Sequence, residues 1–322
     1  MEEYGPEEFL RRISHPYWFQ SFGCVLGFDW HSSGLTTTVG GALKVGLKDV
    51  SKDLGLFVAG GKGGTSRKTP SEIEAVSETL GKDFSKLIYS SRMSAKVDSS
   101  ALQDGYQLYH HNFFFTKSGD WAVVQQGMND SNHFARRYHW LSDSLTSFVE
   151  EPHAAVASNL KVRPLNLTSK NSFDNRLVST SLVAEKPEKT LKQFTKVLEL
   201  KMPHHEIIGE SDIKPENLQK VLLSTYERQP ADFEQLLSIK GVGPKTIRAL
   251  ALISELIYNA PASREGPVKY SFAHGGKDGT PYPIDRKTYD KSIEILKLAV
   301  EKAKIGDKDK IGAIRRLQYS LL

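Results

Sequence analysis

The segment "KGVGPKT", residues 240–246, combines two lysines, two glycines and a hydroxyl where one apolar helical pattern ends and another begins. Its glycines permit a tight turn with positive φ angles and let the backbone approach a ligand closely. The free N–H groups and the dipole at the start of the second helix favour an anion there. This pattern predicts a grip on a phosphate backbone through five residues: Lys240, Gly241, Val242, Gly243 and Thr246. Within this group Val242 is expected to pack between the two helices.

Lys245 lies in the first turn of the second helix and has two candidate roles. It can be a nucleophile, because the positive helix end and nearby Lys240 both disfavour its ammonium form. It can also be a plain phosphate-binding lysine. The alternative for the whole segment is an ordinary glycine-rich link between two core helices. A dinucleotide site does not fit, since there is no third glycine at the required spacing.

A second basic segment, "AGGKGGTSRKT", presents Lys62 between glycines and is followed closely by Arg67 and Lys68. A loop of this kind can offer an amine to a nucleic-acid backbone and hold a phosphate. Its spacing does not match a nucleotide-hydrolysing phosphate loop. Lys62 is therefore the rival candidate nucleophile, with Arg67 and Lys68 as DNA contacts; the alternative is a flexible basic loop.

The segment "FDWHSS" places Asp29, Trp30 and His31 next to one another. An Asp–His pair can act as an acid/base unit, and a tryptophan can stack in a gap of a DNA duplex. The alternative is a cluster at the end of a strand whose polar groups bond to each other. The expected roles are catalysis for Asp29 and His31 and DNA contact for Trp30.

The segments "YHHNFFF" and "VVQQGMN" are expected to face each other across a β-hairpin. Successive residues of a strand point to opposite faces, so His110 and its neighbour cannot share one site. A face with His, Asn and Gln could read DNA or hold a sugar, which makes His110 and Gln126 predicted DNA contacts. The following segment "ARRYHW" adds Arg136 and Arg137 as predicted phosphate contacts.

The composition limits the class of protein. The chain has 322 residues, 39% of them hydrophobic, with a net charge of +5 and a pI near 9.0, which is compatible with a polyanionic partner. Cys24 is the single cysteine, so no disulfide within the chain and no thiolate-rich metal site can form. The His and Asp residues show no usual metal-ligand spacing, and we expect neither a metal nor a cofactor. No secretory or membrane-spanning segment is evident, which predicts a soluble cytoplasmic protein, associated with the nucleoid, without a membrane partner.

The patterning predicts an α+β fold with two parts, a mixed domain over residues 1–185 and a helical domain over 186–322. In the first part we expect short strands at 34–47 and 54–61, and a helix with Thr69 as its N-cap. A hairpin follows at 106–129, with the turn "KSGD", and then a long loop at 159–176. The helical domain contains two helices joined by the glycine turn, over residues 231–259.

The segment "LLSIKGVGPKTIRAL" resembles the helix-hairpin-helix motif of DNA glycosylases that also cut the DNA backbone. In that superfamily a similar segment carries the lysine that forms a Schiff base, and Lys245 occupies the matching position. An assisting aspartate follows in those enzymes. The best match here is Asp285, in "PYPIDRKTYD".

Over its whole length the chain resembles a family, found mainly in thermophilic archaea and bacteria, that has long been classed as a domain of unknown function. The matching segments include "FGCVLGFDWHSSGLTTTV", "VAGGKGGTSRKTP", "YHHNFFF", "FVEEPH" and "DRKTYDKSIEIL". One member is recognised as an apurinic/apyrimidinic lyase with a fold unlike other repair enzymes. The resemblance implies a DNA-repair enzyme that cleaves at abasic sites through a Schiff base and β-elimination, without metal, within base excision repair. The alternatives are a structure- or end-specific DNA nuclease and a non-catalytic DNA-binding protein.

Overall fold

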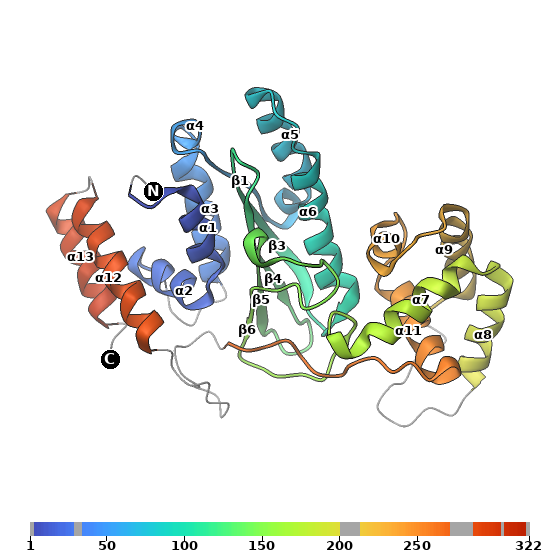
Figure 1. The fold of residues 1–322 in the computed structure, drawn as a ribbon. Helices are drawn as coiled ribbons and strands as arrows, with labels where there is room; N and C mark the ends of the chain where they lie inside the picture. Colours follow the sequence, from blue (N-terminus) through green and yellow to red (C-terminus); the bar gives the residue numbers. More distant parts are fainter. Residues whose placement is uncertain (1–2, 29–33, 200–212, 271–285, 304–305, 320–322) are drawn as a thin grey trace.

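The computed structural model describes residues 3–28, 34–199, 213–270, 286–303 and 306–319. Its centre is a five-stranded sheet in the order β1-β3-β4-β5-β6, in which every neighbouring pair is antiparallel (Figure 1). The strands are β1 (Leu56–Lys62), β3 (Gln107–Thr116), β4 (Trp121–Met128), β5 (Ala135–Leu141) and β6 (Ala155–Ser158). The predicted hairpin is confirmed as β3 and β4, joined by the turn "KSGD".

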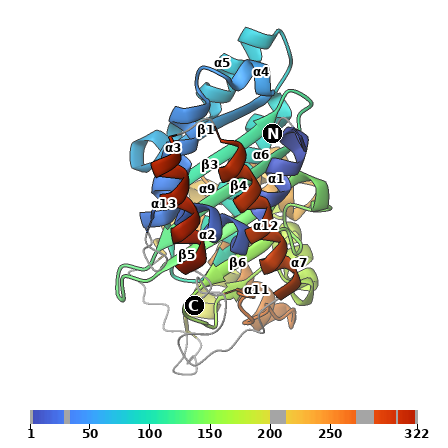
Figure 2. The ribbon, with the colours of Figure 1, turned by 90° about the vertical axis from the view of Figure 1, so that its left-hand side faces the viewer.

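Helices cover both faces of this sheet. One face packs against α1 (Gly5–Ser14), α2 (Pro16–Val25) and α3 (Gly34–Leu47), which enclose a core with Phe114 and Val124. α12 (Arg286–Lys302) and α13 (Asp307–Tyr319) lie outside α2, as Figures 1 and 2 show from two sides. The helices of the other face are α5 (Thr69–Leu80) and α6 (Ser85–Lys96).

A helical lobe lies beyond α6 (Figure 1). It consists of α7 (Phe173–Ala184), α8 (Pro187–Glu199), α9 (Pro215–Arg228), α10 (Phe233–Ser238) and α11 (Pro244–Tyr258). α11 is the central helix and packs against α7 and α8. The expected α+β class, with an antiparallel sheet in the first part and helices in the second, is confirmed.

Short elements connect these parts. They are α4 (Ser51–Leu54), the 3-10 helices η1 (Gly63–Lys68), η3 (Ser142–Ser144) and η4 (Lys170–Ser172), the π-helix η2 (Val97–Ala101), and the paired strands β2 (Leu102–Gln103) and β7 (Leu165–Asn166). A single apolar core runs from the α6 face of the sheet into the helical lobe. The division of the chain at residue 185 stays a prediction.

The strands predicted at 34–47 are wrong, because this segment forms α3. Leu35 and Val39 are buried against the sheet, and Leu43 and Leu47 continue the same four-residue spacing along the helix. Gly40 lets α3 approach the sheet: a Cβ there would lie 1.5 Å from the amide nitrogen of Asn112. The glycines and threonines of this segment suggested turns and strands, but here they allow a helix to pack closely against the sheet.

Two further expectations need correction. The predicted loop 159–176 contains β7 and η4, and α7 begins within it at Phe173. Thr69 is the first residue of α5, not its N-cap, and its hydroxyl donates to the carbonyl of Ser66 at 2.7 Å. The buried face of α7 is largely polar, and Asn175 donates to the carbonyls of Ala251 and Ala260. Because this face is polar, hydrophobic periodicity did not predict the helix.

The Gly60→Ala variant is expected to lower the free energy of unfolding by about 2–4 kcal/mol. Gly60 has a φ of +92°, and an added Cβ would lie 2.1 Å from the carbonyl oxygen of His111 on β3. Denaturant unfolding measures the change. Gly41→Ala is the control: its Cβ meets nothing within 4 Å inside α3, so we expect a gain of about 0.5–1 kcal/mol. Equal stabilities for the two variants would contradict this account of β1.

Candidate functional site

Four residues that the sequence predicted for the site lie in one row across the sheet. Lys62 is opposite His110, His110 is opposite Gln126, and Gln126 is opposite Arg137. Directly opposite residues of antiparallel strands share a face, so this row points toward α2 and α3. The spacing along the chain did not show that segments about 75 residues apart meet here.

The inner end of this row is a buried polar cluster. Gln126 bonds to the hydroxyls of Thr36 and Tyr109. Arg137 donates to Gln20 at 3.1 Å and lies over the ring of Phe19 at 4.5 Å. Burial lowers the pKa of Arg137 to about 9, which still leaves a cation at neutral pH. These contacts hold the charged Arg137 side chain in place at the inner end of the row.

Arg136, on the other face of β5, is also buried. Its guanidinium pairs with Asp104 at 2.7 Å, donates to the carbonyl of Leu160 at 3.0 Å, and lies 4.2 Å from the ring of Tyr106. The sequence predicted that Arg136 and Arg137 contact phosphate. The structure buries both side chains, because β5 is a central strand with helices on both faces, and their charges are engaged inside the protein.

His110 and His111 point to opposite faces, as expected from strand geometry. His111 bonds to Ser91 of α6, whereas His110 lies beside Gly40 of α3. Burial, with smaller effects from His111 and Lys62, lowers the pKa of His110 to about 4. Within the described residues neither ring nitrogen of His110 has a hydrogen-bond partner. His110 is therefore a neutral, unpartnered base next to Lys62.

Both histidines nevertheless border one pocket of about 660 Å³ where β1 ends, which we call the basic pocket, so the expectation that they cannot share a site is wrong. Its walls come from η1, α6, β3 and the end of α10. Its charged side chains are Arg67, Arg92 and Lys96, and its polar ones include Ser91, Ser99, Tyr89 and Ser238. The guanidinium groups of Arg67 and Arg92 beside two imidazoles make this pocket suited to an anionic ligand.

A chain of buried hydrogen bonds runs from the basic pocket into the core. Ser91 Oγ lies 3.0 Å from His111 Nε2, and His111 Nδ1 lies 2.7 Å from Gln125 Oε1. The amide nitrogen of Gln125 bonds to Asp98, which also accepts from Trp140 at 2.9 Å and pairs with His153. Asp98 belongs to η2, a π-helical turn, and such turns occur often at functional sites.

The Gly-Val-Gly turn between α10 and α11 lies against this pocket. Lys96 Nζ is 3.4 Å from the carbonyl oxygen of Ile239, and Gln103 donates to the carbonyl of Pro244 at 2.8 Å. Gly241 has the expected positive φ, +97°, but Gly243 is extended at −136°, so the prediction for Gly243 is wrong. The turn needs a positive φ only at Gly241, because Gly243 has an extended backbone as the N-cap of α11.

The side chains of this turn divide into two groups. Val242 is buried between the helices, as expected, and Thr246 is also buried. Lys240 and Lys245 are exposed. The two lysines are therefore the members of the segment that can meet a ligand directly.

The second basic segment is also ordered by the fold. Lys62 ends β1, and Arg67 and Lys68 end the 3-10 helix η1, with all three side chains exposed. Glu72 of α5 holds this region, since it accepts from the backbone N–H of Gly60 at 2.7 Å and pairs with Lys44. The segment therefore includes a 3-10 helix, Gly63–Lys68.

Several predicted residues have no described position, namely Asp29, Trp30, His31 and Asp285, which lie outside the described residues. In the described parts of the chain, no three His, Cys, Asp or Glu residues are grouped so that they could hold a metal ion. None of the described helices combines the length and apolar character needed to cross a membrane. Cys24 is buried in the core against the α1–α3 face of the sheet.

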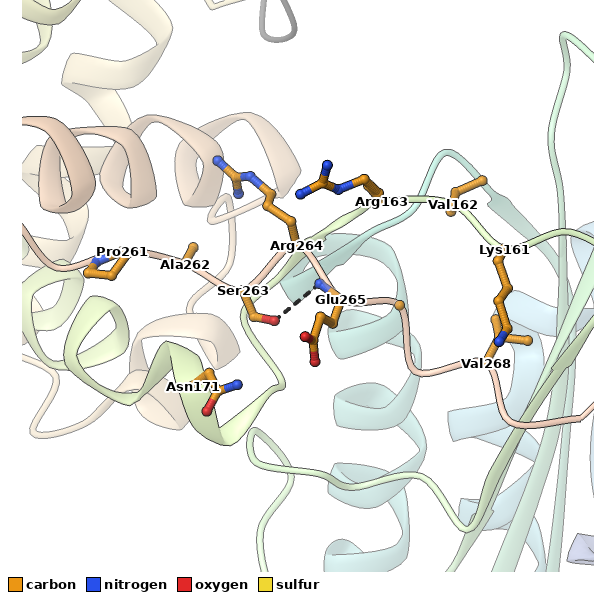
Figure 3. Close-up of a pocket in the computed structure, with 11 residues that line it drawn as sticks. Lys161, Val162, Arg163, Asn171, Pro261, Ala262, Ser263, Arg264, Glu265 and Val268 are labelled. Carbon is orange, nitrogen blue, oxygen red and sulfur yellow. Dashed lines mark hydrogen bonds between the residues drawn. The ribbon is translucent and has the colours of Figure 1, made fainter.

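A second pocket, of about 690 Å³, lies between segment 161–163 and segment 261–268 (Figure 3). Its cations are Lys161, Arg163 and Arg264, and Arg264 pairs with Glu255 at 2.9 Å. Figure 3 shows the Ser263 hydroxyl accepting from the backbone N–H of Glu265 at 3.2 Å, which fixes one wall. This pocket adds positive charge to the protein surface but contains none of the predicted nucleophiles.

Sequence reasoning missed the contribution of α6, from which Ser91, Arg92 and Lys96 reach the basic pocket. The segment "SSRMSAK" follows ordinary helical periodicity and has no motif. Its one signal is that Lys96 ends the helix two residues before the buried Asp98. Tertiary contact with β3 and α10, and not spacing along the chain, gives these residues a shared pocket.

The fold and the site define an α+β protein with a basic pocket at one end of its sheet. The family model "Protein of unknown function (DUF763)" matches residues 1–284, and the chain belongs to this family. This confirms the expected membership in a family of unknown function. A comparison with curated proteins found no match, and a comparison with solved structures found none either.

Proposed function

We propose that this protein is a DNA lyase that cleaves at abasic sites through an imine between a lysine and the sugar aldehyde, without a metal. The observation that carries the proposal is the basic pocket. It places a partly buried lysine, neutral histidines and exposed cations beside the Gly-Val-Gly turn. The reaction needs a neutral amine, a proton acceptor and a grip on the flanking phosphates.

The grip on DNA is assigned to exposed cations on two sides of the pocket. Arg67 and Lys68 lie at the end of η1, and Lys240 and Lys245 lie in and after the Gly-Val-Gly turn. The resemblance of this turn to a helix-hairpin-helix supports DNA as the ligand, since backbone N–H groups there suit phosphate oxygens. A strand that runs from η1 to the turn would cross the pocket.

Borohydride trapping tests the proposal. The full-length chain is mixed, in excess chelator, with a duplex that has one abasic site, and sodium borohydride reduces any imine to a stable covalent adduct. We expect an adduct and strand cleavage with this duplex. A duplex with a tetrahydrofuran analogue, which has no aldehyde, is expected to bind without an adduct. Both results follow from the imine mechanism.

The two other candidate functions give different outcomes in the same experiment. Cleavage without an adduct that stops on addition of chelator would identify a metal-dependent nuclease and contradict the proposal. Binding of both duplexes with neither adduct nor cleavage would identify a non-catalytic DNA-binding protein. The metal-free lyase is the proposal because the described residues supply an amine and imidazoles at the pocket.

A further inference from the structure

Lys96 has the environment of a reactive amine. It is the last residue of α6, lies partly buried in the wall of the basic pocket, and bonds to a backbone carbonyl, that of Ile239. Among the described residues it forms no ion pair, whereas Lys44 pairs with Glu72 at 2.7 Å. Burial lowers the pKa of Lys96. A carbonyl acceptor suits a neutral amine as well as an ammonium, so the site does not require the charged form.

The Ser91–His111 pair beside it is arranged to accept a proton. Gln125 donates through its amide nitrogen to Asp98 and to the carbonyl of Ser94, so its oxygen accepts from His111 Nδ1. This leaves the lone pair of His111 on Nε2, directed at the Ser91 hydroxyl 3.0 Å away. The hydroxyl therefore donates to the imidazole, as in an activated serine. Burial lowers the pKa of His111, and the buried Asp98 carboxylate partly offsets this effect.

We propose that Lys96 is the amine that forms the imine with the abasic sugar, and that the Ser91–His111 pair accepts the proton removed from C2′. This inference rests on the proposed lyase function and assigns its reactive centre to α6 and β3. Ser91 and Lys96 lie five positions apart on α6 and border the same pocket. Arg67 and Arg92 border it too, as phosphate partners.

The steps balance with protons exchanged with solvent. Neutral Lys96 Nζ attacks C1′ of the open-chain aldehyde; the carbonyl oxygen takes one proton from the nitrogen and one from solvent and leaves as water, which gives the iminium C=N⁺–H. The iminium acidifies C2′, whose proton passes to Ser91 Oγ as the serine proton passes to His111. The C2′ electrons form a double bond to C3′ and the C3′–O bond breaks, which releases the 3′ phosphate. Water then hydrolyses the imine and restores Lys96.

The two lysines that the sequence suggested have different surroundings. Lys62 and Lys245 are exposed to solvent and are not among the residues that line the basic pocket. Exposed ammonium groups bind phosphates well but are poor nucleophiles. We therefore assign Lys62 and Lys245 to the grip on DNA and Lys96 to the chemistry.

The experiment maps the reduced adduct on the full-length chain by peptide mass spectrometry and compares four variants. In Lys96→Met the yield of trapped adduct is expected to fall by at least about 100-fold, while the affinity for the tetrahydrofuran duplex changes by less than about 3-fold. Lys62→Met and Lys245→Met are expected to keep the adduct at saturating DNA and to bind more weakly. Lys189→Met, at an exposed position on α8, controls for removal of a lysine.

The outcomes separate this inference from the proposed function. An adduct on the parent chain that maps to Lys62 or Lys245, or that persists in Lys96→Met, overturns the assignment of Lys96 and leaves the lyase function intact. No adduct on the parent chain overturns the lyase function and the assignment together. Mapping on the parent does not depend on whether a variant folds.

The proton acceptor is tested by separating imine formation from elimination. Ser91→Ala is expected to keep the borohydride adduct but to cleave at least about 100-fold more slowly, because only the elimination needs the acceptor. Its cleavage rate should also lose the dependence on pH that the parent shows near the pKa of the pair. A parallel loss of trapping and cleavage would indicate a merely structural role for Ser91. Cleavage at the parental rate would exclude the Ser91–His111 pair as the proton acceptor.

Discussion

The Asp104→Ala variant is expected to lose about 3–5 kcal/mol of unfolding free energy, because it leaves the buried Arg136 guanidinium without its counter-charge. Asp104 accepts from Arg136 and from the Tyr138 hydroxyl, both at 2.7 Å, and from the backbone N–H of Tyr106 at 3.1 Å. The side chains of Arg136 and Asp104 are 0% and 1% exposed, so water cannot replace the lost partner. Urea unfolding at neutral pH measures the loss.

A double-mutant cycle isolates the pair. Arg136→Met alone is expected to be about as harmful as Asp104→Ala, and the two together less harmful than their sum. The ion pair of Lys189 and Glu185 has the same 2.7 Å separation but is exposed, so Lys189→Met is expected to leave stability nearly unchanged. If the losses of unfolding free energy from Asp104→Ala and Arg136→Met are additive, the burial of each side chain, and not their ion pair, causes the destabilisation.

Stability is expected to fall steeply as the pH drops from 6.5 to 4. His110 has its pKa lowered from 6.5 to about 4, so the unfolded chain binds a proton in this range that the folded protein resists. The stability from neutral His110 is complete above pH 6.5, and about 3 kcal/mol is lost as the pH falls to 4. Burial lowers the pKa values of His111 and His139 in the same direction, which steepens the loss.

Urea unfolding between pH 7.5 and pH 4 measures this dependence. His110→Leu is expected to flatten the curve by about 2 kcal/mol between pH 7.5 and pH 5, whatever its stability at neutral pH. The control is His133→Asn, because His133 is exposed and its positive φ of 59° is one that asparagine tolerates. If both variants follow the parental curve, His110 is not the group that titrates.

Local pattern was sufficient for much of the fold. The alternation of "YHHNFFF" and "WAVVQQGM" around a glycine turn predicted β3 and β4, and it placed His110 and His111 on opposite faces. The Gly-Val-Gly segment predicted a turn with a buried valine and a positive φ at Gly241. These features depend on residues within a few positions of each other, which is where backbone sterics and periodicity act.

The errors have a shared cause. Segment 34–47 forms a helix because Leu35 and Val39 pack on the sheet, which outweighs the low helix propensity of its glycines and threonines. Arg136 looked like a surface cation, but Asp104, 32 positions away, holds it in the core. In both cases a distant partner, and not the local composition, decided the outcome.

The sequence by itself determined that the chain has a basic balance, an α+β pattern and two lysine-bearing glycine segments suited to phosphate. Only the tertiary structure decided that Arg67 of the first segment and Ser238, two residues before the second, border one pocket with Lys96, Ser91 and His111. The reason is physical. Residue type and local spacing fix what a side chain can do, whereas burial and the approach of α6 to β3 fix its charge state and its partners.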